Sequence, residues 1–356
     1  MKKINRNSLN GFINYGIVLA AFAILQSLTV TGKLSNSLQS LLVPTCCYIV
    51  MAVSLNLTVG ILGELNLGHA GFMSLGAFSG ITAAIALQGL IPSPALRLTV
   101  ALLVGGAVGA LGGVIIGVPV LRLRGDYLAI VTLAFGEIIK NVIMVLYIGV
   151  DDKGLHIAMS EAGLHLAEGG VTIVKGPMGA VGVPKLASFI AGFLLIMVTL
   201  LVTQNLIASR SGRAIMALRD NRIAAESVGI NVTKYKLMAF VTSAALAGAA
   251  GALFGLNYSS TVSSKFDFNT SILTLVFVVL GGLGNIRGSV IAAALLYVLP
   301  ELLRQFKLAE YRMLIYAIIL ILVMLCTNNP MLRQVVDSVA GKFKKRPAAA
   351  EKGGAQ

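Results

Sequence analysis

The chain has 356 residues, of which 57% are hydrophobic and only 12% are charged, and its formal net charge at pH 7 is +14. A soluble domain is nearer to about a quarter charged, so this composition excludes a disordered chain and argues against a soluble enzyme. The Lys and Arg residues lie between long uncharged stretches, not in one basic patch with interleaved aromatic residues, which argues against nucleic-acid binding. The composition is typical of an all-α polytopic membrane protein.

Long stretches without Asp, Glu, Lys or Arg predict the membrane-spanning helices, since each span needs about 20 mostly apolar residues. One further stretch, 127–150, is equally apolar except for Glu137 and Lys140. We therefore expect about ten spans, or eight to ten, in a single membrane domain over residues 12–332. The uninterrupted stretches are 7–32, 34–63, 65–96, 98–121, 186–209, 237–264, 268–286, 288–300 and 313–332.

Two parts of this pattern leave the number of spans open. The 288–300 stretch is short, although Leu302 and Leu303 can extend it past Glu301. The region 55–80 is rich in glycine. It forms either an ordinary inner turn between two spans or a broken, re-entrant helix, because irregular backbone at membrane depth survives only inside a protein or beside a watery cavity.

Polar residues inside the apolar stretches are candidates for a translocation path, because ionisable groups at membrane depth are rare and mark polar routes. Glu64, Asn66 and His69 interrupt the glycine-rich region, and broken helices often form substrate sites. Glu137 lies about 15 Å into its own stretch at the helical rise and shares a helix face with Lys140. These two residues either form a self-neutralising pair that packs the bundle or line the path.

The distribution of Lys and Arg predicts the orientation, because cytoplasmic segments carry the excess of positive charge. With residues 1–11 inside, the predicted inner segments hold about twice as many Lys and Arg as the outer ones. The two most basic stretches, 210–236 and 333–356, both fall inside, and the long segment 149–185 falls outside. We therefore expect cytoplasmic N- and C-termini, with a basic tail over 333–356 whose last part, 341–356, lies near anionic lipid.

Small residues recur every four positions in two of the predicted helices. Because lipid supplies no hydrophobic drive for helices to associate, such stripes mark places where helix backbones approach closely. We expect close helix contacts at Gly105, Gly109, Gly113 and Gly117, and at Ala244, Gly248 and Ala252.

The sequence carries no recognisable catalytic or metal-binding motif. The outer segment 149–185 contains acidic residues and two histidines, but their spacing matches no ligand pattern, and we interpret it as a solvated loop. The three cysteines lie in apolar stretches without metal-ligand spacing. Because the phosphate-binding GxxxxGK[ST] motif and the common hydrolase motifs are absent, we expect no catalytic residue, no metal and no cofactor bound by this chain.

The inner segment 210–236 is the most informative part of the chain. Residues 213–228 combine good helix formers with an apolar side at Ile215, Leu218 and Ile223, which predicts a short amphipathic helix on the inner face. Such a helix is suited either to docking against another protein or to lying on the membrane surface.

Several motifs in order resemble the LivM-type permeases of branched-chain amino-acid ABC importers, over roughly residues 40–325. Residues 224–229 resemble the EAA loop of ABC-importer permeases, which carries the coupling helix that fits a groove on the ATPase subunit. The other matching motifs lie at 68–71, 121–138, 212–236, 280–288 and 300–303. The resemblance implies an ABC-importer permease bundle with a cytoplasmic coupling helix. It implies that the coupling residues are Arg219, Asp220, Ala224, Ala225, Glu226 and Gly229.

The resemblance also implies a set of partners. A non-catalytic permease subunit of this family provides the path for branched-chain or related amino acids in the bacterial plasma membrane. It works with a second homologous permease, two cytoplasmic subunits that bind ATP and Mg²⁺, an extracytoplasmic solute-binding protein and the surrounding membrane lipid.

The outer segment departs from the family's usual Gly-Gly-Pro-Asn-Gly sequence. Gly176, Pro177 and Gly179 keep the pattern, while Lys175 stands in place of a glycine and Met178 in place of an asparagine. Related permeases carry urea or another small polar solute, so the substrate stays open. An ion-coupled secondary carrier is the alternative from another class, and it would need more buried ionisable residues than this chain has.

Overall fold

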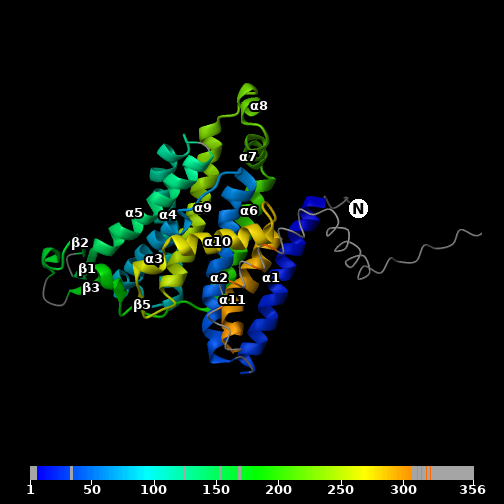
Figure 1. The fold of residues 1–356 in the computed structure, drawn as a ribbon. Helices are drawn as coiled ribbons and strands as arrows, with labels where there is room; N and C mark the ends of the chain where they lie inside the picture. The colour runs from blue at the N-terminus through cyan, green and yellow to red at the C-terminus, as the bar shows by residue number, and fades with distance from the viewer. Residues whose placement is uncertain are drawn as a thin grey trace, which may run out of the picture. The chain divides into compact units, whose positions relative to one another are not determined.

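The computed structural model describes residues 6–305 except 33–34, 124, 152–153 and 167–169, and beyond them residues 311, 314, 318 and 321. The chain forms two compact units, residues 1–302 and 303–356, and the features below belong to the first. The elements, drawn in Figure 1, are α1 (Arg6–Val30), α2 (Asn36–Asn56), the π-helix η1 (Leu57–Leu62), α3 (His69–Ala86), α4 (Pro94–Val120), α5 (Asp126–Val145), β1 (Tyr147–Asp151), β2 (Gly154–Ala158), β3 (Val171–Lys175), β4 (Ala180–Val181), α6 (Phe189–Ala208), α7 (Arg210–Asp220), α8 (Arg222–Ser227), α9 (Val232–Gly255), β5 (Ser260–Thr261), α10 (Phe268–Gly281) and α11 (Ile286–Gln305).

Seven helices among the described residues are long and apolar enough to cross a membrane, which confirms a helical polytopic membrane protein. α1 and α11 also lie where spans are expected, and α11 continues past Glu301. The predicted stretch 313–332 and the tail 333–356 fall outside the described residues, apart from residues 314, 318 and 321. The seven segments are Asn36–Leu62, His69–Ala86, Pro94–Val120, Asp126–Val145, Phe189–Ala208, Val232–Gly255 and Ser263–Gly281.

The glycine-rich region 55–80 forms a helix break inside the bundle. η1 ends at Gly63, whose φ of 79° lies in the left-handed region that glycine adopts without strain. Residues 63–68 are not helical, and α3 begins at His69, whose Nε2 atom lies 2.9 Å from Oγ of Ser54. Ser54 is about 12 Å before the end of η1 at the helical rise. Irregular backbone therefore returns into the bundle before α3 starts.

Glycine faces hold α3, α4 and α9 side by side (Figure 1). A Cβ atom on Gly248 of α9 would lie 2.3 Å from the carbonyl oxygen of Gly105 in α4, and one on Gly76 of α3 would lie 1.9 Å from that of Gly248. Both distances are too short for a real side chain, so the backbones are in direct contact. The predicted close contacts at the two small-residue stripes are confirmed, and the stripes pack against each other.

Replacing Gly248 by alanine is expected to destabilise the protein. Alanine is the better helix former by about 1 kcal/mol, but its methyl group must displace the α4 backbone, and such overpacking costs about 1–3 kcal/mol. Thermal unfolding in mild detergent measures the loss. Gly89→Ala is the matched control, because nothing lies within 4 Å of the Cβ position there. Equal melting temperatures for the two variants would contradict the packing argument.

A small antiparallel sheet stands where the sequence analysis expects a solvated loop over residues 149–185. The strand order is β2–β1–β3–β4–β5, with β1 pairing β2 and β3 on its two sides. The loop interpretation was wrong because it overlooked the apolar residues of this segment. Ile148, Ile173 and Val174 are buried in the sheet, and this burial stabilises the strands.

Candidate coupling site and membrane path

The inner segment 210–236 forms two helices, α7 and α8, and not the single helix expected over 213–228. The chain turns at Asn221, whose backbone is extended with a φ of −154°. The Asn221 side chain caps α8, because its Oδ1 accepts a hydrogen bond of 3.1 Å from the N–H of Ala224. Asparagine is among the strongest N-cap residues. The apolar periodicity that predicted one helix continues across Asn221 and therefore gives no sign of the boundary between α7 and α8.

Apolar contacts attach both short helices to the membrane helices. Ile215 of α7 is fully buried against apolar residues of η1. Leu218 of α7 forms a second cluster with Ala225 of α8 and Val232 of α9. α7 is therefore in direct apolar contact with both η1 and α9. We call the end of the bundle that carries α7 and α8 the coupling end (Figure 1).

The side of α8 that points away from α7 and α9 is exposed in this chain. Ile223 and Val228 expose 79% and 75% of their surfaces, and Ala224 and Gly229 beside them are also exposed. Glu226 lies at the rim, where its Oε1 is 3.3 Å from the guanidinium of the arginine that begins the helix. An apolar patch with a charged rim is typical of a protein contact surface. The predicted coupling residues Ala224, Glu226 and Gly229 lie in this patch.

The other predicted coupling residues lie elsewhere. Ala225 is buried between α7 and α9. Arg219 reaches toward η1, where its Nη1 donates a hydrogen bond of 2.9 Å to the carbonyl oxygen of Gly60. Its Nη2 lies 3.2 Å from Oδ1 of the exposed Asp220. The Arg219 stem also fills the place of a side chain at Gly63, where a Cβ would lie 2.6 Å from its Cγ. Arg219 thus joins the coupling helices to η1.

Asn56, which the sequence analysis missed, extends this link to α11. Its Oδ1 accepts a hydrogen bond of 2.8 Å from the N–H of Gly284, and its Nδ2 donates one of 2.9 Å to Oγ of Ser289. A Cβ on Gly60 would lie 1.9 Å from Asn56 Oδ1, so only glycine leaves room there. The signal that could have found Asn56 is an amide inside a long apolar stretch, since a buried amide needs partners.

Glu64 lies at the coupling end, where it forms an ion pair with Lys236 of α9. The Lys236 side chain is 6% exposed and that of Glu64 is 17% exposed. Lys236 is the second residue that the sequence analysis missed, because it stands just outside the charge-free stretch. The pair fastens the start of the helix break to α9.

Asn66 and His69 are buried, and their side chains hold the irregular backbone in place. Asn66 Oδ1 accepts a hydrogen bond of 3.0 Å from the N–H of Gly68. His69 contacts Ser54 through Nε2, while its Nδ1 has no hydrogen-bond partner among the described residues. In this conformation the two side chains are packed into the bundle.

Glu137 lies on α5 next to the helix break. It pairs with Lys140, and its Oε1 accepts a hydrogen bond of 3.2 Å from the N–H of Phe268, the first residue of α10. The neighbouring Gly136 packs against Gly68, and a Cβ on Gly136 would lie 3.0 Å from the Cα of Gly68. The structure therefore brings Glu137 close to the break that contains the other three path candidates. The self-neutralising pair is present, and 32% of the Glu137 side chain is still exposed.

The predicted outer residues Gly176, Pro177 and Gly179 make the turn that joins β3 to β4. The two glycines have φ values of 51° and 69°, which glycine adopts without strain. A Cβ on Gly179 would lie 2.2 Å from the carbonyl oxygen of Thr261 in β5. These three residues therefore shape the five-stranded sheet.

No group of three or more His, Cys, Asp or Glu side chains in the described part of the chain is placed to hold a metal ion. In the five-stranded sheet, Nε2 of His156 lies 3.0 Å from Oδ1 of Asp151. Tyr258 and Lys265 make a separate contact. Burial raises the pKa of Tyr258 above its usual value, and the Lys265 ammonium lies 4.7 Å from the centre of the Tyr258 ring. A phenol that stays neutral gives Lys265 a cation–π partner, not an ion pair.

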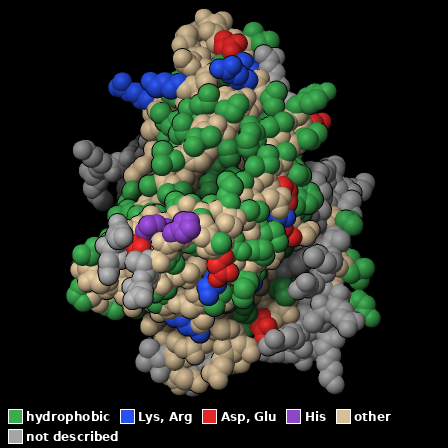
Figure 2. Space-filling model, turned by 90° about the vertical axis from the view of Figure 1, so that its left-hand side faces the viewer, with side chains coloured by type: hydrophobic (Ala, Val, Ile, Leu, Met, Phe, Trp, Pro, Cys, Tyr) green, Lys and Arg blue, Asp and Glu red, His purple; other side chains and the backbone are tan. Residues whose placement is uncertain are grey.

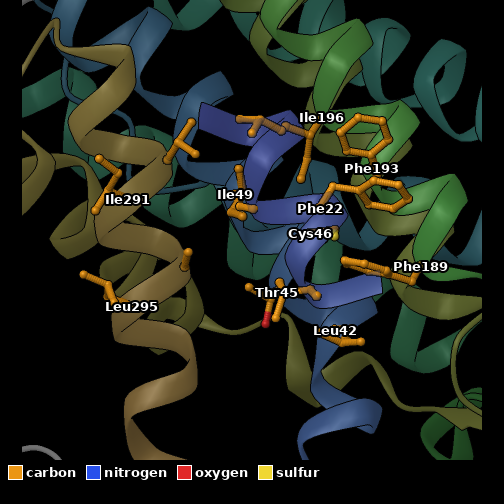
Figure 3. Close-up of a pocket in the computed structure, with 15 residues that line it drawn as sticks. Phe22, Leu42, Thr45, Cys46, Ile49, Phe189, Phe193, Ile196, Ile291 and Leu295 are labelled. Carbon is orange, nitrogen blue, oxygen red and sulfur yellow. The ribbon is translucent and has the colours of Figure 1, made fainter. Parts of the chain in front are cut away.

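Two cavities between the membrane helices have apolar walls. One of about 250 Å³ lies between α1, α2, α6 and α11, and Figure 3 shows Phe22, Phe189 and Phe193 along its side. The other, about 840 Å³, is a groove between α4 and α6 over α9. The hydroxyl groups of Thr45 and Thr99 in these walls already donate to backbone carbonyls. Such walls suit hydrocarbon and not the charged ends of an amino acid.

The sequence model of the family described as "branched-chain amino acid transport system / permease component" matches residues 37–324, which is most of the chain. The chain belongs to this family. The predicted resemblance to LivM-type permeases is confirmed. As a permease component, this chain is a multi-pass membrane subunit without a catalytic role of its own.

Individual relatives agree with the family. The permease is 36% identical over 320 residues to "High-affinity branched-chain amino acid transport system permease protein LivM" of Salmonella typhimurium, which covers 85% of this chain and 72% of the relative. It is also 36% identical over 294 residues to the LivM protein of Escherichia coli. This match covers 79% of this chain and 66% of the relative. The LivH permease protein of Salmonella typhimurium is 33% identical over 117 residues, 33% of this chain and 38% of LivH. No solved structure matches the permease.

Proposed function

We propose that this permease provides one half of the path through which an ATP-driven importer carries branched-chain amino acids across the bacterial plasma membrane. The substrate class follows the names of the LivM relatives. The observation that supports energy coupling is the hydrogen bond from Arg219, beside the EAA-like loop, to Gly60 at the helix break. ATP and Mg²⁺ bind to partner subunits, and this chain holds no cofactor.

The partners follow from the same assignment. A second homologous permease completes the path, consistent with the similarity of this chain to both LivM and LivH. Two ATP-binding subunits contact the exposed side of α8 in the cytoplasm, where both termini also lie. A solute-binding protein delivers the amino acid to the outer side, over the sheet β2–β1–β3–β4–β5.

The mechanism transmits a movement of the ATP-binding subunits to the membrane path. When these subunits close on ATP, they displace α8 and α7 together. Ile215 and Arg219 pass the displacement to η1. Asn56 passes it on to Gly284 and so to α11. The helix break starts directly after η1, so its two flanking helices change their relative positions and the path opens to the other side.

Purification of the tagged permease in mild detergent, with identification of the proteins that accompany it, tests the proposal. We expect a second permease and a P-loop ATPase pair. The reconstituted complex with its binding protein should then take up leucine, isoleucine or valine only when ATP is supplied. A permease that arrives alone and moves solute without ATP would overturn the proposal in favour of a secondary carrier. Uptake of urea in place of the amino acids would overturn the proposed substrate and leave the assignment as an ATP-driven importer in place.

Replacing Glu226 by lysine is expected to separate ATP hydrolysis from uptake. The reversed charge faces the ATP-binding subunit at the rim of the exposed patch and also repels the arginine four residues earlier. We expect uptake to fall at least about tenfold, about 1.4 kcal/mol of lost coupling, while the chain stays inserted. Glu226→Gln keeps the shape and should retain most uptake. Normal uptake by Glu226→Lys would contradict the coupling role of α8.

A further inference from the structure

The exposed sides of α4 and α5 differ in their chemistry. Along α4 the exposed residues are apolar apart from Thr99, as at Leu103, Leu111 and Ile115. The groove of about 840 Å³ beside them is apolar as well. Lipid chains cover such a surface without cost to any polar group. This side of the permease is therefore suited to face the lipid.

The exposed side of α5 includes charge and amide groups at membrane depth. Glu137 lies about 16 Å from the start of a helix that is about 30 Å long, so it is near the middle of the span. Its side chain is 32% exposed and that of Lys140 is 19% exposed. Asn141 on the same helix is exposed. Ionisable groups at this depth face the inside of a bundle or water and not lipid.

The first turn of α10 continues this surface. The hydrogen bond from the Phe268 N–H to Glu137 holds α10 at the same depth. Phe268 is 37% exposed and the amide of Asn269 beside it is exposed too. We define the α5 face as Ile130, Ala134, Ile138, Asn141, Phe268 and Asn269. Figure 2 looks at the side on which α5 and the sheet lie, where acidic and basic side chains are set among hydrophobic ones.

The outer sheet extends the apolar surface beyond the end of α5. β1 follows α5 directly, and the outermost strand β2 exposes Leu155 and Ile157 to 52% and 61%. Met159, just after β2, is 78% exposed. Exposed apolar side chains on a sheet of this kind are typical of a protein contact. A partner that covers both the α5 face and β2 needs membrane helices and an outer portion.

We propose that the second, homologous permease packs against the α5 face and β2, and that the Glu137–Lys140 pair lies in the interface between the two permeases. This inference rests on the proposed function, because it requires that a second permease exists. A permease of the same fold has the membrane helices and the outer sheet that the surface requires. The interface removes the Glu137–Lys140 pair from lipid, and it leaves the apolar side of α4 to the bilayer.

Photo-crosslinking within the purified complex tests the inference. A benzophenone amino acid is placed at Ile138 or Ile157, and at Leu103 or Ile115 of α4 as controls, in separate samples that already contain the second permease. Irradiation should join the two permeases from Ile138 and Ile157 and not from the control positions. Adducts with the second permease from α4 only, or from none of the four positions, would overturn the inference. Absence of the second permease before irradiation would overturn the proposed function as well, so the two failures are distinguished.

A matched pair of bulky substitutions gives a second readout. Ala134 on α5 and Ala107 on α4 are both exposed, so neither Ala134→Trp nor Ala107→Trp should disturb folding of the single chain. We expect Ala134→Trp to lower the recovery of the second permease at least about tenfold, which corresponds to about 1.4 kcal/mol, and Ala107→Trp to leave it unchanged. The opposite result, with recovery lost only in Ala107→Trp, would place the partner on α4.

Discussion

Replacing Asn56 by leucine is expected to lower ATP-driven uptake at least about tenfold while the assembled complex continues to hydrolyse ATP. Leucine has a similar size, but it leaves the partly buried N–H of Gly284 without the side chain that accepts its hydrogen bond. Such an unsatisfied donor costs about 1–3 kcal/mol, and about 1.4 kcal/mol corresponds to a tenfold effect. The contact between η1 and the start of α11 is thereby weakened. Amino-acid uptake into proteoliposomes, measured beside ATPase activity, gives the result.

Thr58→Val is the matched control for the Asn56 variant. Thr58 is 1% exposed and lies only two residues away, but its hydroxyl donates to the carbonyl oxygen of Leu55 at the end of α2. Its loss leaves the link to Gly284 intact, so uptake should stay near that of the native permease. Equal losses in both variants would mean that reduced stability, and not the link to α11, limits uptake.

Replacing Lys236 by methionine is expected to destabilise the permease more than Gly248→Ala does. Methionine fills the volume of the lysine stem but leaves the carboxylate of Glu64 without its ion-pair partner. Breaking a buried pair from one side costs about 3–5 kcal/mol, and the 17% exposure of Glu64 places the effect near the lower value. Thermal unfolding in detergent, followed by circular dichroism, measures the loss.

Two further variants separate the ion pair from other roles of Lys236. Lys234→Met removes an exposed lysine from the same helix and should change stability by no more than about 0.5 kcal/mol. The double variant Glu64→Gln/Lys236→Met removes both charges and should recover most of the lost stability, because no unpaired carboxylate remains. A double variant as unstable as Lys236→Met alone would contradict the importance of the pair.

The features that could be predicted from the sequence are those that depend on neighbouring residues. The helices of the bundle follow the charge-free stretches, because a span must be long and apolar wherever it packs. The break after η1 coincides with the glycine-rich region, where Gly63 provides the left-handed backbone that ends the helix. The exposed patch on α8 coincides with the EAA-like residues Ala224, Glu226 and Gly229.

The features that could not be predicted depend on residues far apart in the chain. Asn56 and Gly284 are separated by 228 positions, and no local pattern indicates that they meet. Arg219 was predicted as a coupling residue, and no local pattern indicates that its guanidinium also donates a hydrogen bond to the carbonyl oxygen of Gly60, 159 positions earlier. The sheet was missed because the apolar residues of its short strands, such as Ile148 and Ile173, were not weighed, and because the strands also depend on pairing between separate segments.

The distance along the chain between Glu64 and Lys236 imposes an order on biogenesis. The two residues are 172 positions apart, and a ribosome adds about 5–20 residues per second, so the carboxylate waits roughly 10–30 s for its partner. During this interval Glu64, in the break between η1 and α3, has no ion-pair partner, and α3 lacks the glycine face of α9 against which it packs. The helix break therefore acquires its ion pair and its packing partner only after α9 has been synthesised.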